Sequence, residues 1–157
     1  GTGTLLEMAQ RSGLDCIGID TSWGMLLETK KKVPAAEVVQ ANFYALPFSE
    51  NNFDYVVETN AVSGAEINPK SVLQEMLRVC KDKGELRLGD YGNSGREGLW
   101  IQILVMFGIL VGDYPHDYQE LFRSLGYEVE IEDLGWGGMY QYIRVVKQHQ
   151  VINEEIT

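Results

Sequence analysis

The sequence has 157 residues, of which 45% are hydrophobic and 23% are charged, a balance that suits one compact domain with a substantial core. Its 13 basic and 23 acidic residues give a formal net charge of −10, which repels phosphate backbones and argues against a nucleic-acid partner. We therefore expect a small or uncharged substrate.

Signals for metal binding, disulfides and secretion are weak. Cys16 lies in an apolar stretch and Cys80 follows an expected helix, so the two form neither a CxxC pair nor a disulfide framework. With only His116 and His149 as histidines, a catalytic metal is not expected. The first residues lack the basic start and apolar block of a signal peptide, so we expect a cytoplasmic protein.

Strands and helices alternate along the chain, which predicts an α/β fold with a mainly parallel sheet and helices on both faces. In chain order, we expect a helix at Thr4–Arg11, a strand at Asp15–Asp20, a helix at Ser22–Lys32, strands at Glu37–Gln40 and Phe53–Thr59, a helix at Pro69–Val79, a strand at Glu85–Asp90, a helix at Asp117–Leu125, and strands at Glu128–Leu134 and Gln141–Lys147. The last two strands are joined by a connection too short for a parallel crossover, so they should form an antiparallel hairpin. We expect one domain over residues 1–147 and a polar tail over residues 148–157.

A glycine turn and a carboxylate occupy the ends of successive elements. Gly1 and Gly3 precede the first helix, and Asp20 ends the first expected strand. Glycine lets a backbone approach a ligand closely, and a carboxylate can accept hydrogen bonds from both hydroxyls of a ribose. On these residues alone, a tight turn with Asp20 capping the helix that starts at Ser22 explains the pattern equally well.

Four stretches of the sequence extend the pattern of a glycine turn followed by a carboxylate. In order, they are Gly1-Thr2-Gly3, GIDTSWGML from Gly18 to Leu26, ANFYALPFSENNFD from Ala41 to Asp54, and LQEMLRVCK from Leu73 to Lys81. Together they resemble the S-adenosylmethionine-dependent class I methyltransferases of ubiquinone and menaquinone biosynthesis, the methyltransferase type 11 family. Members of that family carry a further strand and helix ahead of the glycine turn. We expect this chain to lack both and to fold poorly by itself, because a parallel sheet without its central strand exposes apolar edges.

The resemblance implies a Rossmann-like class I methyltransferase fold and S-adenosylmethionine as the cofactor. The cofactor-binding residues that it implies are Gly1, Gly3, Asp20, Thr21, Met25, Asn42, Phe43 and Glu58. By resemblance, the two glycines lie beside the methionine and ribose, and Asp20 binds the ribose hydroxyls. Met25 packs on the adenine, although an apolar helix residue is as easily part of a core.

Two of these positions depart from the family pattern. Asn42 replaces the usual aspartate at the adenine edge, and an amide oxygen is a weaker acceptor than a carboxylate. Phe43 replaces a small residue, although its backbone N–H can still bind adenine. The backbone of Glu58 would meet the methionine end of the cofactor, while its side chain is equally consistent with function and with an ordinary loop.

The stretch from Leu99 to Val111, LWIQILVMFGILV, is apolar on all sides and too short to span a bilayer. In this family the corresponding segment, here residues 96–116, commonly forms a substrate lid, which would suit a lipophilic or aromatic acceptor. A helix buried in the core or in a homodimer interface explains the same composition equally well.

His116 is the candidate general base, because histidine titrates near neutral pH. It lies before an expected helix, in a loop that can face an acceptor. The plainer interpretation is a histidine in the turn before a helix that Asp117 caps. Asp54 and the pair Glu75 and Arg78 are expected to be structural, the latter as an ion pair three residues apart on one helix.

The favoured function is methyl transfer to a small lipophilic or aromatic acceptor such as a quinone-like ring. A non-catalytic protein that binds S-adenosylmethionine, or a scaffold with a methyltransferase fold, is the alternative, because fold alone does not fix function. A nicotinamide-dependent dehydrogenase is a distant third, since the glycine turn and acid fit it but the stretch from Leu46 to Asp54 does not.

Overall fold

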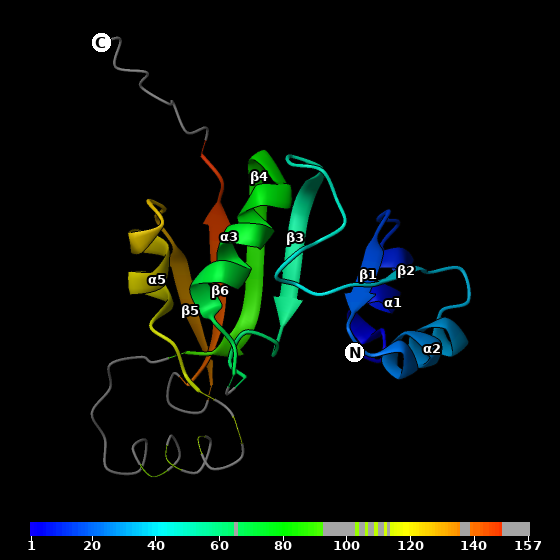
Figure 1. Cartoon of the computed structure of the whole chain (residues 1–157), viewed down its shortest axis with the longest axis horizontal. Coiled ribbons are helices and arrows are strands. Elements are labelled where there is room, and N and C mark those ends of the chain that lie inside the picture. Colours follow the sequence, from blue (N-terminus) through cyan, green and yellow to red (C-terminus); the bar gives the residue numbers. More distant parts are fainter. Residues whose placement is uncertain are drawn as a thin grey trace. The chain divides into compact units, whose positions relative to one another are not determined.

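The structure is a computed structural model, and it describes residues 1–64, 66–92, 103, 106, 109, 112, 114–135 and 139–148. The elements are α1 (Thr4–Arg11), β1 (Ile17–Asp20), α2 (Trp23–Lys32), β2 (Glu37–Gln40), β3 (Phe53–Thr59), α3 (Pro69–Val79), β4 (Cys80–Tyr91), α5 (Tyr118–Ser124), β5 (Glu130–Gly135) and β6 (Tyr140–Val146) (Figure 1). They form two compact units, Gly1–Pro47 and Phe48–Thr157. The expected single domain over residues 1–147 stays a prediction.

The first unit contains α1, β1, α2 and β2. The strands β1 and β2 pair in parallel, with Ile17 opposite Glu37. Ser22 caps α2 by accepting a hydrogen bond from the Met25 amide at 3.4 Å, so the helix starts at Trp23, one residue later than expected. Five residues are buried in this unit, and none of them comes from α1: Leu26, Thr29, Val33, Ala36 and Leu46.

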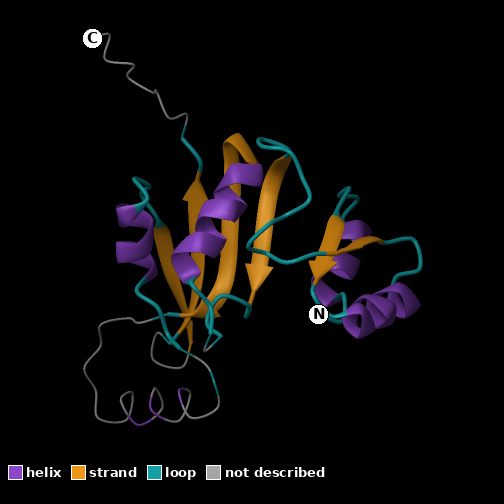
Figure 2. Cartoon of the chain, in the orientation of Figure 1, coloured by secondary structure: helices purple, strands orange, loops and turns teal. Residues whose placement is uncertain are grey.

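The second unit contains a four-stranded sheet in the order β3-β4-β6-β5 (Figure 2). β3 and β4 pair in parallel, whereas β6 pairs antiparallel with both β4 and β5. The C-terminal antiparallel hairpin predicted from the short connection is therefore confirmed. β4 is longer than expected and begins directly after α3, at Cys80.

The core of the second unit lies between one face of this sheet and its helices. Leu86 and Leu88 of β4 are fully buried and lie opposite Val145 and Ile143 of β6. α3 packs on β4, and α5 adds the fully buried Phe122. Strand alternation puts the intervening residues of β4 on the other face of the sheet.

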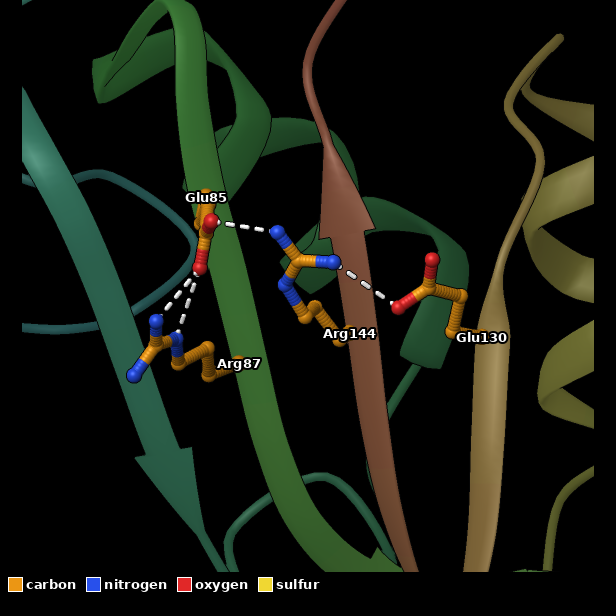
Figure 3. Close-up of polar contacts among 4 residues, drawn as sticks. All are labelled: Glu85, Arg87, Glu130 and Arg144. Carbon is orange, nitrogen blue, oxygen red and sulfur yellow. Dashed lines mark hydrogen bonds and ion pairs between the residues drawn. The ribbon is translucent and has the colours of Figure 1, made fainter.

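That other face carries a ladder of charged side chains (Figure 3). Glu85 accepts hydrogen bonds from Arg87 at 2.6 Å and from Arg144 at 2.5 Å, and Arg144 also donates to Glu130 at 2.8 Å. The guanidinium of Arg87 lies 4.8 Å from the centre of the Tyr55 ring. Figure 3 shows α3 behind the strands that carry this ladder, so the charged network and the apolar core occupy opposite faces of the sheet.

Candidate functional site

The glycine turn at the start of the chain packs tightly on α2. Gly3 has φ +76°, and a Cβ there would lie 2.6 Å from Cγ2 of Thr29. Thr29 is buried, and its hydroxyl donates to the carbonyl oxygen of Gly1 at 2.9 Å. Position 3 therefore requires glycine both for its backbone conformation and for the space around it. Thr29 is a residue that the sequence reasoning missed.

Asp20 lies beside this turn, at the carboxyl end of β1. Its Oδ1 accepts a hydrogen bond from the Ser22 amide at 2.8 Å, and its Oδ2 contacts the Gly1 nitrogen. The turn and the carboxylate are thus neighbours, although Ser22 and not Asp20 is the N-cap of α2.

The other predicted cofactor residues of this unit lie near the ends of β1 and β2. The Thr21 carbonyl accepts from the Gln40 side chain at 2.9 Å, which ties the two strand ends together. Met25 is 42% exposed, so it is not a core residue. Asn42 is exposed, and its Oδ1 accepts from the amide of Tyr44 at 2.9 Å. Phe43 is half-buried.

The chemistry of these residues suits an adenine nucleoside as the ligand. A carboxylate that already accepts N–H donors lies beside a close-packed glycine turn, and ribose hydroxyls are donors of the same kind. Exposed apolar surface follows in Trp23 and Met25, which are 56% and 42% exposed. This end of the first unit is the candidate cofactor site.

Glu58 is the one predicted cofactor residue of the second unit, near the end of β3. Its Oε1 accepts from the Ala61 amide, and its Oε2 is buried with no hydrogen-bond partner in the described part of the chain. Burial first, and then the nearby charge of Asp90, raises the pKa of Glu58 to about 8. Its carboxyl group therefore differs chemically from an ordinary surface glutamate.

Asp90, near the end of β4, is fully buried and was not predicted as a site residue. Its Oδ2 accepts from the amides of Val62 and Ser63 at 3.0 Å each, and its Oδ1 accepts from the Tyr91 amide at 2.7 Å. Such hydrogen bonds stabilise a buried carboxylate. The signal available in the sequence was an acidic residue in phase with the buried Leu86 and Leu88.

His116 is half-buried, in the segment that precedes α5. Its Nε2 lies 3.2 Å from the Val62 carbonyl oxygen, and its backbone N–H donates to the Tyr91 carbonyl. The side chain of Asp117 accepts from the Glu120 amide at 2.9 Å, which confirms the expected helix cap. The structure therefore connects His116 to the ends of both β3 and β4.

Most of the expected lid from Leu99 to Val111 lies outside the described residues, as do Trp136–Gly138 and His149. Ile103, Met106 and Ile109 are described, and all three are helical and at least 40% exposed. Within the described residues, no helix combines the length and the apolar character needed to cross a membrane.

The expected ion pair between Glu75 and Arg78 is confirmed, and Asp54 also has a charged partner. Arg78 donates to both carboxylate oxygens of Glu75, at 2.7 and 2.8 Å, and also to the Phe48 carbonyl. The Lys81 ammonium contacts both oxygens of Asp54 at 2.9 Å. Neither pair is free for chemistry.

Comparison with known proteins agrees with this arrangement. The sequence profile of the family described as "Methyltransferase domain" matches residues 1–88. A demethylmenaquinone methyltransferase of Renibacterium salmoninarum is 37% identical over 93 residues, which are 59% of this chain and 39% of that protein. One of Beutenbergia cavernae is 28% identical over 154 residues, covering 88% of this chain and 63% of that protein. The chain thus spans less than two thirds of the length of these relatives.

Among solved structures, the methyltransferase in complex with the Trm112 methyltransferase activator of Haloferax volcanii has a TM-score of 0.76 and 18% identity, covering 95% of this chain and 80% of that chain. This similarity shows the Rossmann-like class I fold. The family match implies S-adenosylmethionine as the cofactor. The profile covers more than half of the chain, and the glycine turn with its neighbouring carboxylate falls inside the matched region: the chain belongs to the methyltransferase domain family.

Proposed function

We propose that the protein transfers a methyl group from S-adenosylmethionine to a small lipophilic or aromatic acceptor, with a quinone-like ring as the favoured class. The observation that carries the proposal is the close-packed glycine turn beside Asp20, in a chain of the methyltransferase domain family. The demethylmenaquinone methyltransferases among its relatives support the acceptor class. The exposed apolar side chains of Ile103, Met106 and Ile109 also favour an apolar acceptor.

Residues of the first unit would hold the cofactor, which supplies an electrophilic methyl group when bound. Asp20 would accept hydrogen bonds from the ribose hydroxyls, beside the Gly1 and Gly3 backbone. Met25 offers exposed apolar surface for the adenine, and the Phe43 amide a donor for its ring nitrogen. These assignments follow the family resemblance together with the contacts between Asp20 and the glycine turn.

His116 is the candidate proton acceptor in the second unit. With the Nε2–H group donating to the Val62 carbonyl, the other ring nitrogen, Nδ1, is the one free to accept a proton in the neutral imidazole. Its role would be to take the proton of an acceptor hydroxyl and so to make the acceptor more nucleophilic.

The alternative function is a protein that binds the cofactor without methyl transfer. The observation that favours it is Asn42, which is neutral and whose Oδ1 already accepts the Tyr44 amide. That site has less acceptor capacity for an adenine amino group than a free carboxylate would have.

The cofactor part of the proposal is tested by calorimetric titration of the protein with S-adenosylmethionine and with NAD. We expect binding of the first alone, and we expect Asp20→Ala to weaken it at least thirtyfold, about 2 kcal/mol, because ribose donors lose a charged acceptor. Asp15→Ala removes an exposed carboxylate from the same unit and should leave affinity unchanged. Equal affinity of Asp20→Ala and the wild type would show that the ribose role is wrong.

The acceptor part is tested by assaying methyl transfer to a demethylated quinol, to an aminophospholipid and to charged polar metabolites. Transfer to the quinol is the expected result, and transfer confined to the charged metabolites would refute the apolar acceptor. Trp100→Ser and Phe107→Ser, both outside the described residues, test the lid prediction. Lid variants should stay folded and keep cofactor affinity while turnover falls, whereas core or dimer variants should lose thermal stability or the oligomer.

A further inference from the structure

Two carboxyl groups from neighbouring strands bind one short loop. The loop is residues 61–63, directly after the end of β3. The Ala61 amide donates to Glu58, and the amides of Val62 and Ser63 donate to Asp90 at 3.0 Å each. Three successive backbone N–H groups thus share two carboxyl groups. We name residues 61–63 the carboxyl-bound loop.

The carbonyl groups of the carboxyl-bound loop face the segment before α5. The Ser63 carbonyl accepts from the Tyr114 amide at 2.7 Å, and the Val62 carbonyl lies 3.2 Å from Nε2 of His116. Val62 is itself fully buried. One residue therefore connects Asp90, through its N–H, to the imidazole of His116, through its C=O.

The surroundings of Glu58 contain further polar groups. Tyr118 of α5 is 1% exposed and its hydroxyl lies close to Asp90, while Oε2 of Glu58 has no hydrogen-bond partner in the described part of the chain. Burial, followed by the charges of Asp90 and Glu58, raises the pKa of Tyr118. Tyr140 of β6, whose hydroxyl donates to Gly89 at 2.9 Å, also has its pKa raised by burial first, with both carboxylates contributing.

The groups around Glu58 therefore include an acid from β4, phenols from α5 and β6, and the imidazole beyond the carboxyl-bound loop. None of the described cations forms an ion pair with Glu58 or Asp90. A negative charge on Glu58 close to the buried Asp90 is unfavourable, because two like charges in a medium of low polarity repel strongly. Protonation of Glu58 removes that repulsion.

We propose that Glu58, protonated at neutral pH, and Asp90 are positioning residues that hold the carboxyl-bound loop and, through Val62, the imidazole of His116. While Glu58 is protonated, Asp90 is the carboxylate that binds the Val62 and Ser63 amides. When Glu58 loses its proton, repulsion between the two carboxylates loosens the loop. The inference rests on the proposed function only where His116 is taken as the proton acceptor.

The pH range follows from the burial of Glu58 and its proximity to Asp90, which raise the pKa of Glu58 to about 8. The carboxyl-bound loop is thus mostly held at neutral pH and increasingly released as the pH rises above 8. An ordinary surface glutamate would complete its titration far below this range.

The first test needs no catalytic activity. Hydrogen exchange of the Ala61, Val62 and Ser63 amides is measured from pH 6 to pH 10 and corrected for the intrinsic pH dependence of exchange. Protection should fall about tenfold as the pH passes 8 in the wild type. It should stay level in Glu58→Gln, because glutamine is neutral throughout. Glu132→Gln, an exposed change on β5, should behave as the wild type. The same alkaline loss in Glu58→Gln would overturn the proposal.

The second test links the loop to His116. We expect the ratio of methyl-transfer rates at pH 9 and pH 7 to be at least fivefold higher in Glu58→Gln than in the wild type or in Glu132→Gln. The NMR chemical shifts of the His116 ring should change near pH 8 as Glu58 titrates, and Glu58→Gln should remove that change. An unchanged rate ratio together with the absence of that change in the wild type would refute the positioning role. If no acceptor is methylated, the proposed function fails, while the exchange and NMR results still decide this inference.

Discussion

The two compact units of this protein differ in what stabilises them. The first unit buries five residues, and α1 contributes none of them. The second buries residues from α3, α5, β4 and β6 around one face of its sheet and carries a charged ladder on the other. The first unit therefore relies more on local turns and polar contacts around the glycine turn, while the second has a continuous hydrophobic core.

The largest expected effect tests this difference in the cores. Phe122→Ala should lower the free energy of unfolding of the second unit by about 3–5 kcal/mol, because a fully buried ring leaves a cavity between α5 and the sheet. Leu26→Ala, the matched change in the first unit, should cost about 2 kcal/mol. The cost is smaller because the core of this unit is thinner, so neighbouring side chains can move into the space that Leu26 leaves. Hydrogen exchange, followed separately for the amides of each unit, measures both changes in the free energy of unfolding.

Leu27→Ala, on an exposed position of α2, is the control and should change neither unit by more than about 0.5 kcal/mol. A larger loss from Leu26→Ala than from Phe122→Ala would reverse the comparison of the two units.

The charged ladder gives the next effect, which depends on pH. Hydrogen bonds from Arg144 and then Arg87 lower the pKa of Glu85 to about 2, so its contribution is present above pH 4.5 and is lost as the pH falls toward 2. Glu85→Gln should reduce the free energy of unfolding at pH 7 by about 1–2 kcal/mol, and the difference from the wild type should shrink in acid. Denaturant unfolding at several pH values measures it.

Glu130→Gln is the graded control, because the Glu130 side chain is 76% exposed, against 17% for Glu85. Its cost should stay below about 0.5 kcal/mol. Equal costs for the two variants would mean that the ladder does not depend on Glu85 as its central acceptor.

The smallest effect concerns binding by the first unit. Asn42→Asp should tighten S-adenosylmethionine binding by about 1 kcal/mol, roughly fivefold, because a carboxylate can accept the Tyr44 amide and a ligand donor together. Asn52→Asp adds the same charge in the second unit and should leave affinity unchanged. Weaker binding by Asn42→Asp would show that this position does not contact the adenine amine.

Local structure was largely predictable from the sequence. The bounds of α1, α3, β2 and β3 are confirmed residue for residue. Where helices start, capping explains the small differences, because Ser22 and Asp117 are caps and not first helical residues. The pair Glu75 and Arg78 was also predictable, since residues three apart share one helix face.

Less could be predicted of the candidate site in the second unit. Glu58 could be named as a candidate, but its partners could not. They are backbone amides of a loop, and which residue types carry those amides does not reveal the hydrogen bonds. Asp90 lies 28 positions from Val62 in the chain, and only the parallel pairing of β3 and β4 brings it to the carboxyl-bound loop. The close contact between Gly3 and Thr29 could not be predicted for the same reason, because α1 and β1 separate the two residues in the chain.

The sequence by itself determined the order of the elements, the C-terminal hairpin, the family and the glycine turn with its carboxylate, because periodicity, capping residues and short spacings act over a few residues. Only the tertiary structure decided which carboxyl groups come together near the ends of β3 and β4. The raised pKa of Glu58, the burial of Asp90 and the tie to His116 arise from desolvation and from contacts between distant segments, which exist only once the strands have paired.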